Sequence, residues 1–166
     1  MLTYDRFNTD IGLLTVVKIE RVICFIDLPS VTMSRVEAWA NRHFPGESLR
    51  SAPAPFEQER HELRGYTSGS RTSFTFPLDH RNTPFSLQVL EEVRRVPYGG
   101  TASYGDIARR VGHPRATRAV GRAVAANPLP LVIPCHRVVG SDGSLTGFGG
   151  GLSLKRELLL LESCGA

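Results

Sequence analysis

The chain has 166 residues, of which 41% are hydrophobic and 22% charged, a composition typical of a soluble protein with one or two small domains. No apolar run approaches the roughly 18 residues of a membrane span, and the first residues lack the pattern of a signal peptide. Three cysteines without regular spacing do not suit a disulfide framework. We therefore expect a cytoplasmic protein in a reducing environment, with no membrane partner.

Charge is distributed unevenly along the chain. Residues 1–81 carry ten basic and ten acidic side chains, whereas residues 82–166 carry ten and six, so the whole net charge of +4 lies in the second half. Between Arg94 and Arg137 there are eight arginines and a single acid, Asp106. Such a run can be merely a solvated face, but an arginine excess beside a helix pair is typical of a nucleic-acid binder.

The first half, residues 1–80, is predicted to be a small α/β domain with an antiparallel sheet. Residues 11–17 and 22–28 are short β-rich runs joined by a polar turn, which indicates a hairpin. Cys24 lies in the second run between apolar neighbours and is expected in the core. The histidines of this half have no metal-ligand spacing. We expect it to support the second half.

Further elements of the first half follow the hairpin. Ser34 is a candidate cap for a helix that continues to residue 44 and ends before Pro45-Gly46. A second helix is expected over residues 56–66. Residues 73–78 then alternate between apolar and polar side chains, which predicts a strand.

Residues 79–82 mark a change in composition, and we place the boundary of a second domain there, spanning residues 81–166. Thr83-Pro84 predicts the start of a helix, because proline is favoured at the first helical position. That helix ends before Pro97. Ser103 and Asp106 have capping-box spacing and predict a second helix, which ends at Gly112.

Pro114 is expected to open a third helix of this domain. Its predicted inner face consists of small apolar residues: Ala116, Ala119, Val120, Ala123 and Val124. Two such helices joined by a short glycine-containing turn form a helix-turn-helix. The predicted fold class is therefore α+β, with a mostly helical second domain resembling a winged helix-turn-helix.

The second helix of this pair has unusually small side chains for a recognition helix, which ordinarily presents long polar groups to the major groove. Small residues let a helix approach closely, which suits the narrower minor groove. The alternative is that they only pack one helix on another. That alternative does not account for Gly121, which costs about 1 kcal/mol of helix propensity.

Residues 127–139 form the segment around which the chain is organised. Three prolines exclude a regular helix or central strand, and the apolar residues between them indicate a stiff, buried segment. It places Cys135 beside His136 and Arg137, and an electropositive setting of this kind lowers a cysteine pKa and activates a nucleophile. A buried structural cysteine is the alternative.

The end of the chain adds three elements. Residues 141–144 are predicted to form a tight turn, which is a candidate wing. Residues 146–151 are dense in glycine, which indicates backbone placed close to another group. A leucine-rich helix over residues 152–161 then brings Glu162 to the end of the chain.

Several of these motifs together resemble the O6-alkylguanine-DNA alkyltransferases. The residues that carry the resemblance are Pro134-Cys135-His136-Arg137-Val138, Tyr104, Arg118-Ala119-Val120-Gly121 and Asn127-Pro128. The match runs from Thr83 to Glu162, and the first half matches only through the start of its hairpin. The resemblance implies DNA repair by direct reversal: the protein flips O6-alkylguanine out of the duplex and transfers the alkyl group irreversibly to Cys135, once per chain and without a cofactor.

The resemblance also implies roles for the other catalytic residues. His136, acting through a water, would take the proton of Cys135, and Glu162 would orient the imidazole, as in a nucleophile–base–orienter triad. Asn127 would tie the cysteine segment to the helix-turn-helix. Tyr104 would hydrogen-bond the departing guanine.

For the DNA, the resemblance implies binding of double-stranded DNA with O6-alkylguanine through the minor groove by a monomer. Arg118 would enter the base stack and fill the gap left by the extruded base, whose flipping costs a few kcal/mol. The remaining implied DNA contacts are Ser86, His113, Thr117, Gly121 and Ser141.

The substrate pocket would be formed by Tyr104, Val138, Phe148 and Gly149. The sequence departs from the family here, because Phe148 stands where tyrosine is frequent and Gly149 where a serine can occur. Phe148 can still stack on the base, and the Gly149 N–H can still donate to O6. No zinc-ligand set is present in the sequence.

Two other classes of function share some of these motifs. A non-catalytic lesion-binding protein of alkyltransferase type would lack the acceptor cysteine, and a helix-turn-helix regulator would need base-reading side chains on its second helix. A thiol hydrolase would use Cys135 and His136 directly, but neighbouring residues of an extended segment point to opposite sides. The transferase accounts best for all the motifs.

Overall fold

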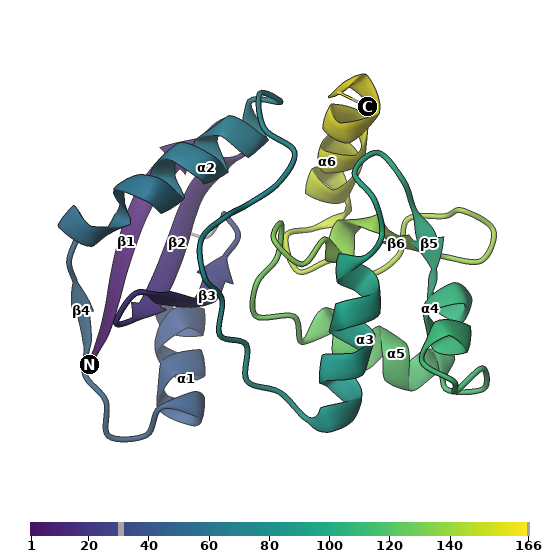
Figure 1. Cartoon of the computed structure of the whole chain (residues 1–166), viewed down its shortest axis with the longest axis horizontal. Helices are drawn as coiled ribbons and strands as arrows, with labels where there is room; N and C mark the ends of the chain where they lie inside the picture. The colour runs from purple at the N-terminus through teal and green to yellow at the C-terminus, as the bar shows by residue number, and fades with distance from the viewer. Residues whose placement is uncertain (30–31, 166) are drawn as a thin grey trace. The chain divides into compact units, whose positions relative to one another are not determined.

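The computed structural model describes residues 1–29 and 32–165. The chain divides into two compact units, Met1–Arg81 and Asn82–Ala166, both drawn in Figure 1. Each has its own secondary structure and hydrophobic core. Within the described residues, no helix combines the length and apolar character that crossing a bilayer requires. The architecture is mixed α+β, as predicted.

The first unit is built on a four-stranded sheet with the order β3-β2-β1-β4. Its strands are β1 (Leu2–Thr9), β2 (Gly12–Ile19), β3 (Val22–Asp27) and β4 (Leu49–Ser51). The predicted hairpin is confirmed as β2 and β3, which pair antiparallel. Strand β1 was not predicted, because charged residues interrupt its apolar pattern, but it pairs antiparallel with all of β2. Strand β4 pairs parallel with β1.

Two helices pack on this sheet. Helix α1 (Ser34–His43) contacts β3, and α2 (Glu57–Thr67), preceded by the 3-10 turn η1 (Ala54–Phe56), contacts β1. Ser34 does not cap α1: Met33 occupies the cap position, and its side chain makes no cap hydrogen bond. Helix α1 ends at His43, one residue before the predicted end, and Pro45-Gly46 follows its cap residue Phe44. Cys24 lies in the core, as expected, among buried apolar residues of β1, β2, β3 and α1.

The strand predicted over residues 73–78 is wrong. The segment is extended but pairs with β3 only through an isolated bridge between Ile23 and Leu78. The backbone N–H of Thr75 instead donates to the Glu62 carboxylate of α2, at 2.7 Å. Pro77 has no N–H to contribute to a ladder, so side-chain hydrogen bonds replace strand pairing here.

The second unit is mostly helical, with α3 (Pro84–Arg94), α4 (Tyr104–Arg110), α5 (Thr117–Ala125) and α6 (Leu152–Gly165). Helices α3, α4 and α5 contact one another in all three pairs, and Figure 1 shows them side by side. Both predicted caps are present, because Thr83 accepts from the third residue of α3 and the α4 capping box is formed in both directions. Helices α4 and α5 form the predicted helix-turn-helix.

Helix α5 differs from its prediction in two respects. It begins at Thr117 and not at Pro114, because residues 113–116 form a turn closed by a hydrogen bond from the Ala116 N–H to the His113 carbonyl. Ala119 is exposed and Ala116 only half-buried, whereas Val120, Ala123 and Val124 are buried as expected. The surface of α5 is therefore formed by small residues and two arginines.

A pair of two-residue strands joins the helices to the cysteine segment. Strand β5 (Ala102–Ser103) pairs parallel with β6 (Val138–Val139), which directly follows the 3-10 turn η2 (Cys135–Arg137). The predicted tight turn at residues 141–144 is present, closed by a 2.8 Å hydrogen bond from the Gly140 N–H to the Ser144 carbonyl. In the described part of the chain, β6 pairs only with β5, so this turn is not the tip of a wing hairpin.

Candidate active site

The segment of residues 127–134 is a buried loop that sets the position of Cys135. Leu129, Leu131 and Ile133 are at most 1% exposed. The side chain of Asn127 holds both ends of the loop: its amide nitrogen donates to the Ile133 carbonyl at 2.8 Å, and its oxygen accepts from the Leu129 N–H at 3.0 Å. Leu131 has a φ of 73°, a strained value for a residue with a branched side chain. The prediction of a buried segment is confirmed.

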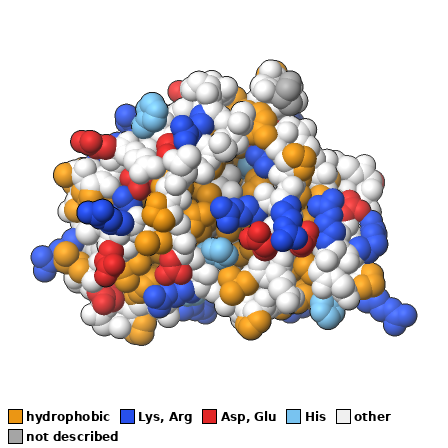
Figure 2. All heavy atoms as spheres, in the orientation of Figure 1, with side chains coloured by type: hydrophobic (Ala, Val, Ile, Leu, Met, Phe, Trp, Pro, Cys, Tyr) orange, Lys and Arg blue, Asp and Glu red, His pale blue; other side chains and the backbone are white. Residues whose placement is uncertain are grey.

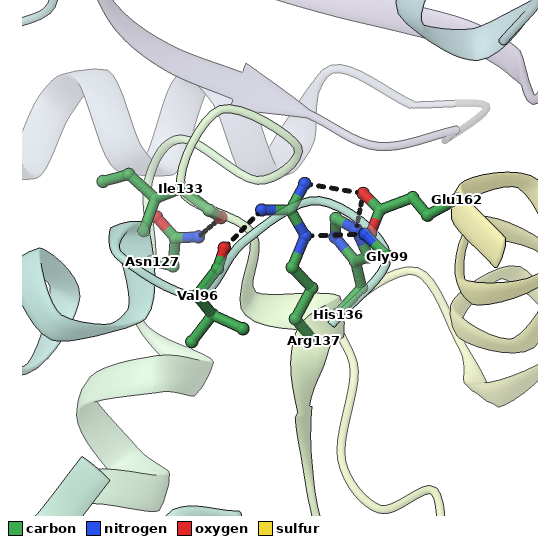
Figure 3. Close-up of polar contacts among 7 residues, drawn as sticks. All are labelled: Val96, Gly99, Asn127, Ile133, His136, Arg137 and Glu162. Atoms are coloured by element: carbon green, nitrogen blue, oxygen red, sulfur yellow. Dashed lines mark hydrogen bonds and ion pairs between the residues drawn. The ribbon is translucent and has the colours of Figure 1, made fainter. Parts of the chain in front are cut away.

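The buried carboxylate of Glu162 organises the two residues that follow Cys135 in the chain (Figure 3). It accepts hydrogen bonds from His136 Nε2 at 2.8 Å and from Arg137 Nε and Nη2, both at 2.8 Å. The Gly99 N–H donates to it at 3.3 Å. Arg137 also donates to the Val96 carbonyl at 2.6 Å. The Glu162 carboxylate thus connects helix α6, the turn η2 and the residues after α3.

The protonation of His136 follows from these contacts. The bidentate contact with Arg137 keeps Glu162 ionised, and a carboxylate only accepts hydrogen bonds. The imidazole must therefore carry a proton on Nε2. Burial lowers the pKa of His136, Glu162 raises it, and Arg137 and Lys155 lower it, with a net downward shift. The ring is thus a neutral imidazole whose Nδ1 is the basic nitrogen, which suits a general base.

The pKa of the Cys135 thiol contradicts the expectation from its neighbours in sequence. The guanidinium of Arg137 is turned to Glu162 and does not lower this pKa. Burial raises the pKa of Cys135, and the Asn127 side chain and the charge of Lys155 only partly offset it. Since the thiol is favoured over the thiolate at rest, the site needs a base that removes the proton during the reaction. Cys135 and His136 lie in the 3-10 turn η2 and not in an extended segment. The expectation that their side chains point to opposite sides, which counted against a thiol hydrolase, therefore does not apply.

Tyr104 lies at the first position of α4, with its hydroxyl donating to the Thr146 carbonyl at 3.1 Å. Burial raises its pKa, the bond to Thr146 lowers it, and the charge of Cys135 raises it. These influences keep Tyr104 a phenol, which can donate a proton. Of the other predicted pocket residues, Val138 is fully buried, Phe148 half-buried and Gly149 exposed.

Lys155 of α6 was missed by the sequence interpretation. Its ammonium is fully buried and donates to the Val138 carbonyl at 2.5 Å and to the Thr146 carbonyl at 2.9 Å. Thr146 therefore accepts from both Lys155 and Tyr104. The signal that could have found Lys155 is its position seven residues before Glu162, which places both on the same helix face in a leucine-rich helix.

The residues predicted to contact DNA lie on α3, in the turn before α5, on α5 itself and in the turn after β6. Arg118 and Thr117 are exposed at the start of α5, and a Cβ added at Gly121 would meet nothing within 4 Å. His113 is exposed in the turn before α5, with its ring edge-on to Phe85 at 5.8 Å. That contact places it near the half-buried Ser86. Figure 2 shows basic side chains gathered on the right of the view, over α3 and α4 of Figure 1, and these are arginines because both lysines of the chain are buried.

Ser141 is exposed in the tight turn after β6 and is not joined to the other predicted DNA contacts by any hydrogen bond among the described residues. A metal site is a separate question. Within residues 1–29 and 32–165, no group of three or more His, Cys, Asp or Glu side chains is arranged to hold a metal ion.

Comparison with known proteins places both halves of the chain in one family. Residues 84–164 match the family described as 6-O-methylguanine DNA methyltransferase, DNA binding domain. Residues 2–80 match 6-O-methylguanine DNA methyltransferase, ribonuclease-like domain. The first half, which the motifs left nearly unassigned, therefore matches the same family as the second.

Individual relatives agree with these matches. The chain is 37% identical to a methylated-DNA–protein-cysteine methyltransferase of Mycolicibacterium paratuberculosis over 98% of this chain and 93% of that protein. It is 40% identical to an inducible one of Bacillus subtilis over 84% of this chain and 78% of that protein. The crystal structure of Mycobacterium tuberculosis OGT in complex with DNA superposes with a TM-score of 0.85, at 35% identity over 99% of this chain and 94% of that one. This chain therefore belongs to the methylated-DNA–protein-cysteine methyltransferases, enzymes that repair DNA by transferring an alkyl group to one of their own cysteines.

Proposed function

We propose that this protein removes the alkyl group from O6-alkylguanine in double-stranded DNA and that Cys135 is its single-use acceptor. The observation that carries the proposal is the buried contact of Glu162 with His136 and Arg137, directly beside Cys135. It holds a neutral imidazole next to a thiol that burial keeps protonated. A thiol of this kind reacts only when a base removes its proton, so the geometry suits a nucleophile activated at the moment of reaction.

The transfer begins with removal of the Cys135 proton. His136 accepts this proton at Nδ1 through a bridging water, and Glu162 stabilises the resulting imidazolium. The sulfur then attacks the alkyl carbon on O6, a C–S bond forms, and the C–O6 bond breaks with its electron pair going to guanine. The hydroxyl of Tyr104 donates to the guanine as this negative charge develops. The proton lost by the thiol ends on guanine.

The product of this reaction explains why one chain acts once. Cys135 becomes a thioether, and no side chain at this site can hydrolyse its carbon–sulfur bond. No cofactor takes part in the proposed step, because the nucleophile, base and proton donor are all side chains. The alternative, a non-catalytic lesion-binding protein, leaves the Glu162–His136 pair and Cys135 without a role.

DNA is proposed to bind along α5 through its minor groove, with the protein as a monomer. The exposed part of α5 has small residues around Gly121, and the open space there lets the helix approach the sugar-phosphate walls closely. Arg118 is exposed at the start of the same helix and is proposed to fill the stack when the damaged base is flipped out. His113, Ser86, Thr117 and Ser141 are proposed to contact the DNA backbone.

The first prediction concerns the acceptor. Cys135→Ala should abolish alkyl transfer from duplex DNA with one O6-methylguanine, because no other group at the site can form the thioether, while binding of that DNA is retained. The matched control is Cys164→Ala, which removes an exposed cysteine of the same unit and should transfer at the wild-type rate. Release of labelled methyl from DNA and gel-shift binding measure the two properties. Transfer by Cys135→Ala would overturn the assignment.

The second prediction separates base flipping from chemistry. Arg118→Ala should slow transfer from duplex DNA by tenfold or more, which corresponds to a rise of about 1.4 kcal/mol or more in the activation free energy. Transfer from free O6-benzylguanine should be nearly unchanged, because a free base needs no flipping. Arg122→Ala, four residues further along α5, is the control for loss of one positive charge. Equal losses on both substrates would refute this role of Arg118.

The third prediction uses the open space at Gly121. Gly121→Ala should stabilise the isolated protein by about 1 kcal/mol, because alanine favours a helix and nothing lies within 4 Å of the added carbon. The same methyl group should weaken binding to duplex DNA, because it lies between α5 and the groove. Thermal unfolding and binding titrations test both effects on one variant. Higher stability with unchanged DNA affinity would exclude close approach of α5 at this position.

A further inference from the structure

A short segment after α3 contacts the buried ion pair of Glu162 and Arg137 at three points. It begins with the Val96 carbonyl, which accepts from Arg137 at 2.6 Å, and ends with the Gly99 N–H, which donates to Glu162 at 3.3 Å. Between these two contacts lies Tyr98, and the Arg137 guanidinium carbon lies over its ring, 5.6 Å from the centroid. This distance is within the range of a cation–π contact.

Tyr98 stands at the boundary between this ion pair and the solvent. Its neighbours Pro97 and Gly99 are exposed, and Gly99 has no side chain. The Glu162 carboxylate, to which the segment is hydrogen-bonded, is fully buried, and Arg137 is 7% exposed. The Tyr98 side chain is half-buried, and its hydroxyl oxygen is buried. Its ring is therefore the group of this segment that can keep water from the carboxylate.

The hydroxyl end of Tyr98 lies against the last turn of α6. A Cβ added at Gly165 would be 3.0 Å from the hydroxyl oxygen and 3.4 Å from a ring carbon of Tyr98. Burial and the charge of Glu162 raise the pKa of Tyr98, Arg137 lowers it and Cys164 raises it, with a net upward shift. Tyr98 is thus a neutral phenol seated between η2 and the end of α6.

The protonation of His136 depends on how well water is excluded from this cluster. Burial is the largest influence on the pKa of His136 and lowers it, whereas the hydrogen bond and charge of Glu162 raise it. Water beside the carboxylate would relieve the burial more than it weakens the contact with Glu162, so the pKa of His136 would rise. The charged or titratable groups around the ring are Glu162 and Lys155 of α6, Cys135 and Arg137 of η2, Tyr98 after α3 and Tyr104 of α4.

We propose that Tyr98 is a positioning residue of the transfer reaction: its ring excludes water from the Glu162–Arg137 ion pair and so preserves the base at His136. The inference rests on the proposed function of Cys135. It adds a group that acts through Glu162 and touches neither the thiol nor the guanine. If Tyr98 only packed the fold, its removal would lower stability and leave the pH at which the base titrates unchanged.

The first test follows the rate of transfer from free O6-benzylguanine against pH, because a free base removes any effect of pH on DNA binding. Transfer is lost as the pH falls through the pKa of His136, since a protonated ring cannot accept the thiol proton. In Tyr98→Ala this loss should occur about one pH unit higher, equivalent to a tenfold higher proton affinity. The conservative variant Tyr98→Phe keeps the ring over Arg137 and should stay close to the wild type. A lower rate with an unmoved acid limb in Tyr98→Ala would overturn the proposal.

Nuclear magnetic resonance titration of the imidazole carbons measures the same property without the reaction. The chain has five histidines. The signal of His136, identified by its absence in His136→Gln, should titrate at a higher pH in Tyr98→Ala than in the wild type. The other four signals are internal controls and should not move. An unchanged His136 titration would count directly against the exclusion of water by Tyr98.

Gly165 offers a test from the other end of the ring. Gly165→Ala places a carbon 3.0 Å from the Tyr98 hydroxyl oxygen, so it should displace the ring and move the acid limb in the same direction as Tyr98→Ala. In the double variant with Tyr98→Phe this oxygen is absent, and the limb should return toward the wild type. Equal effects of Gly165→Ala in the two backgrounds would contradict the seating of the hydroxyl against α6.

The two proposals fail in distinguishable ways. If wild-type Cys135 takes no alkyl group from DNA, the proposed function fails, while the histidine titration still reports on Tyr98. If transfer is normal and neither the acid limb nor the His136 signal moves in Tyr98→Ala, only the role of Tyr98 fails. Should Tyr98→Ala not fold, Gly165→Ala with and without Tyr98→Phe keeps the aromatic ring and decides the proposal.

Discussion

The carboxylate of Glu162 is the contact on which the second unit depends. It is fully buried and accepts from His136 and Arg137, so one acidic side chain sets both the tautomer of the base and the direction of the guanidinium. Arg137 extends the contact to the Val96 carbonyl after α3. Removing one member of a buried charge pair costs about 3–5 kcal/mol, because the remaining charge is left uncompensated. The position of Cys135 therefore follows from an electrostatic constraint as much as from packing of its proline-rich segment.

Parts of the fold could be predicted from local signals in the sequence. The caps at Thr83 and Ser103 were predictable because each depends on residues three positions apart, and both are formed. Strand β1 and the extended course of residues 73–78 were not predictable in this way. Strand β1 owes its existence to pairing with β2, and the later segment is held by Glu62 from a distant helix. Such contacts join different elements, and the periodicity within one segment alone does not reveal them.

The candidate site, too, could be predicted only in part. The motif around Cys135 indicated the nucleophile and the neighbouring imidazole. The family resemblance implied the remote Glu162, and the structure brings His136 and Glu162 together at 2.8 Å. The sequence could not indicate that Arg137 turns away from the thiol or that burial raises the pKa of Cys135. Both depend on what surrounds the side chains in space. Lys155 was missed for a related reason, since a lysine in a helix is ordinarily a surface residue.

The central claim is that Cys135 accepts one alkyl group and is consumed. Intact-protein and peptide mass spectrometry after mixing with excess duplex DNA bearing one O6-methylguanine tests it most directly. The account predicts a gain of one methyl group, located on the peptide that contains Cys135 and saturating at one per chain however long the incubation. Repaired DNA in excess of protein, a methyl group on Cys24 or Cys164, or tight binding without any change in mass would contradict it.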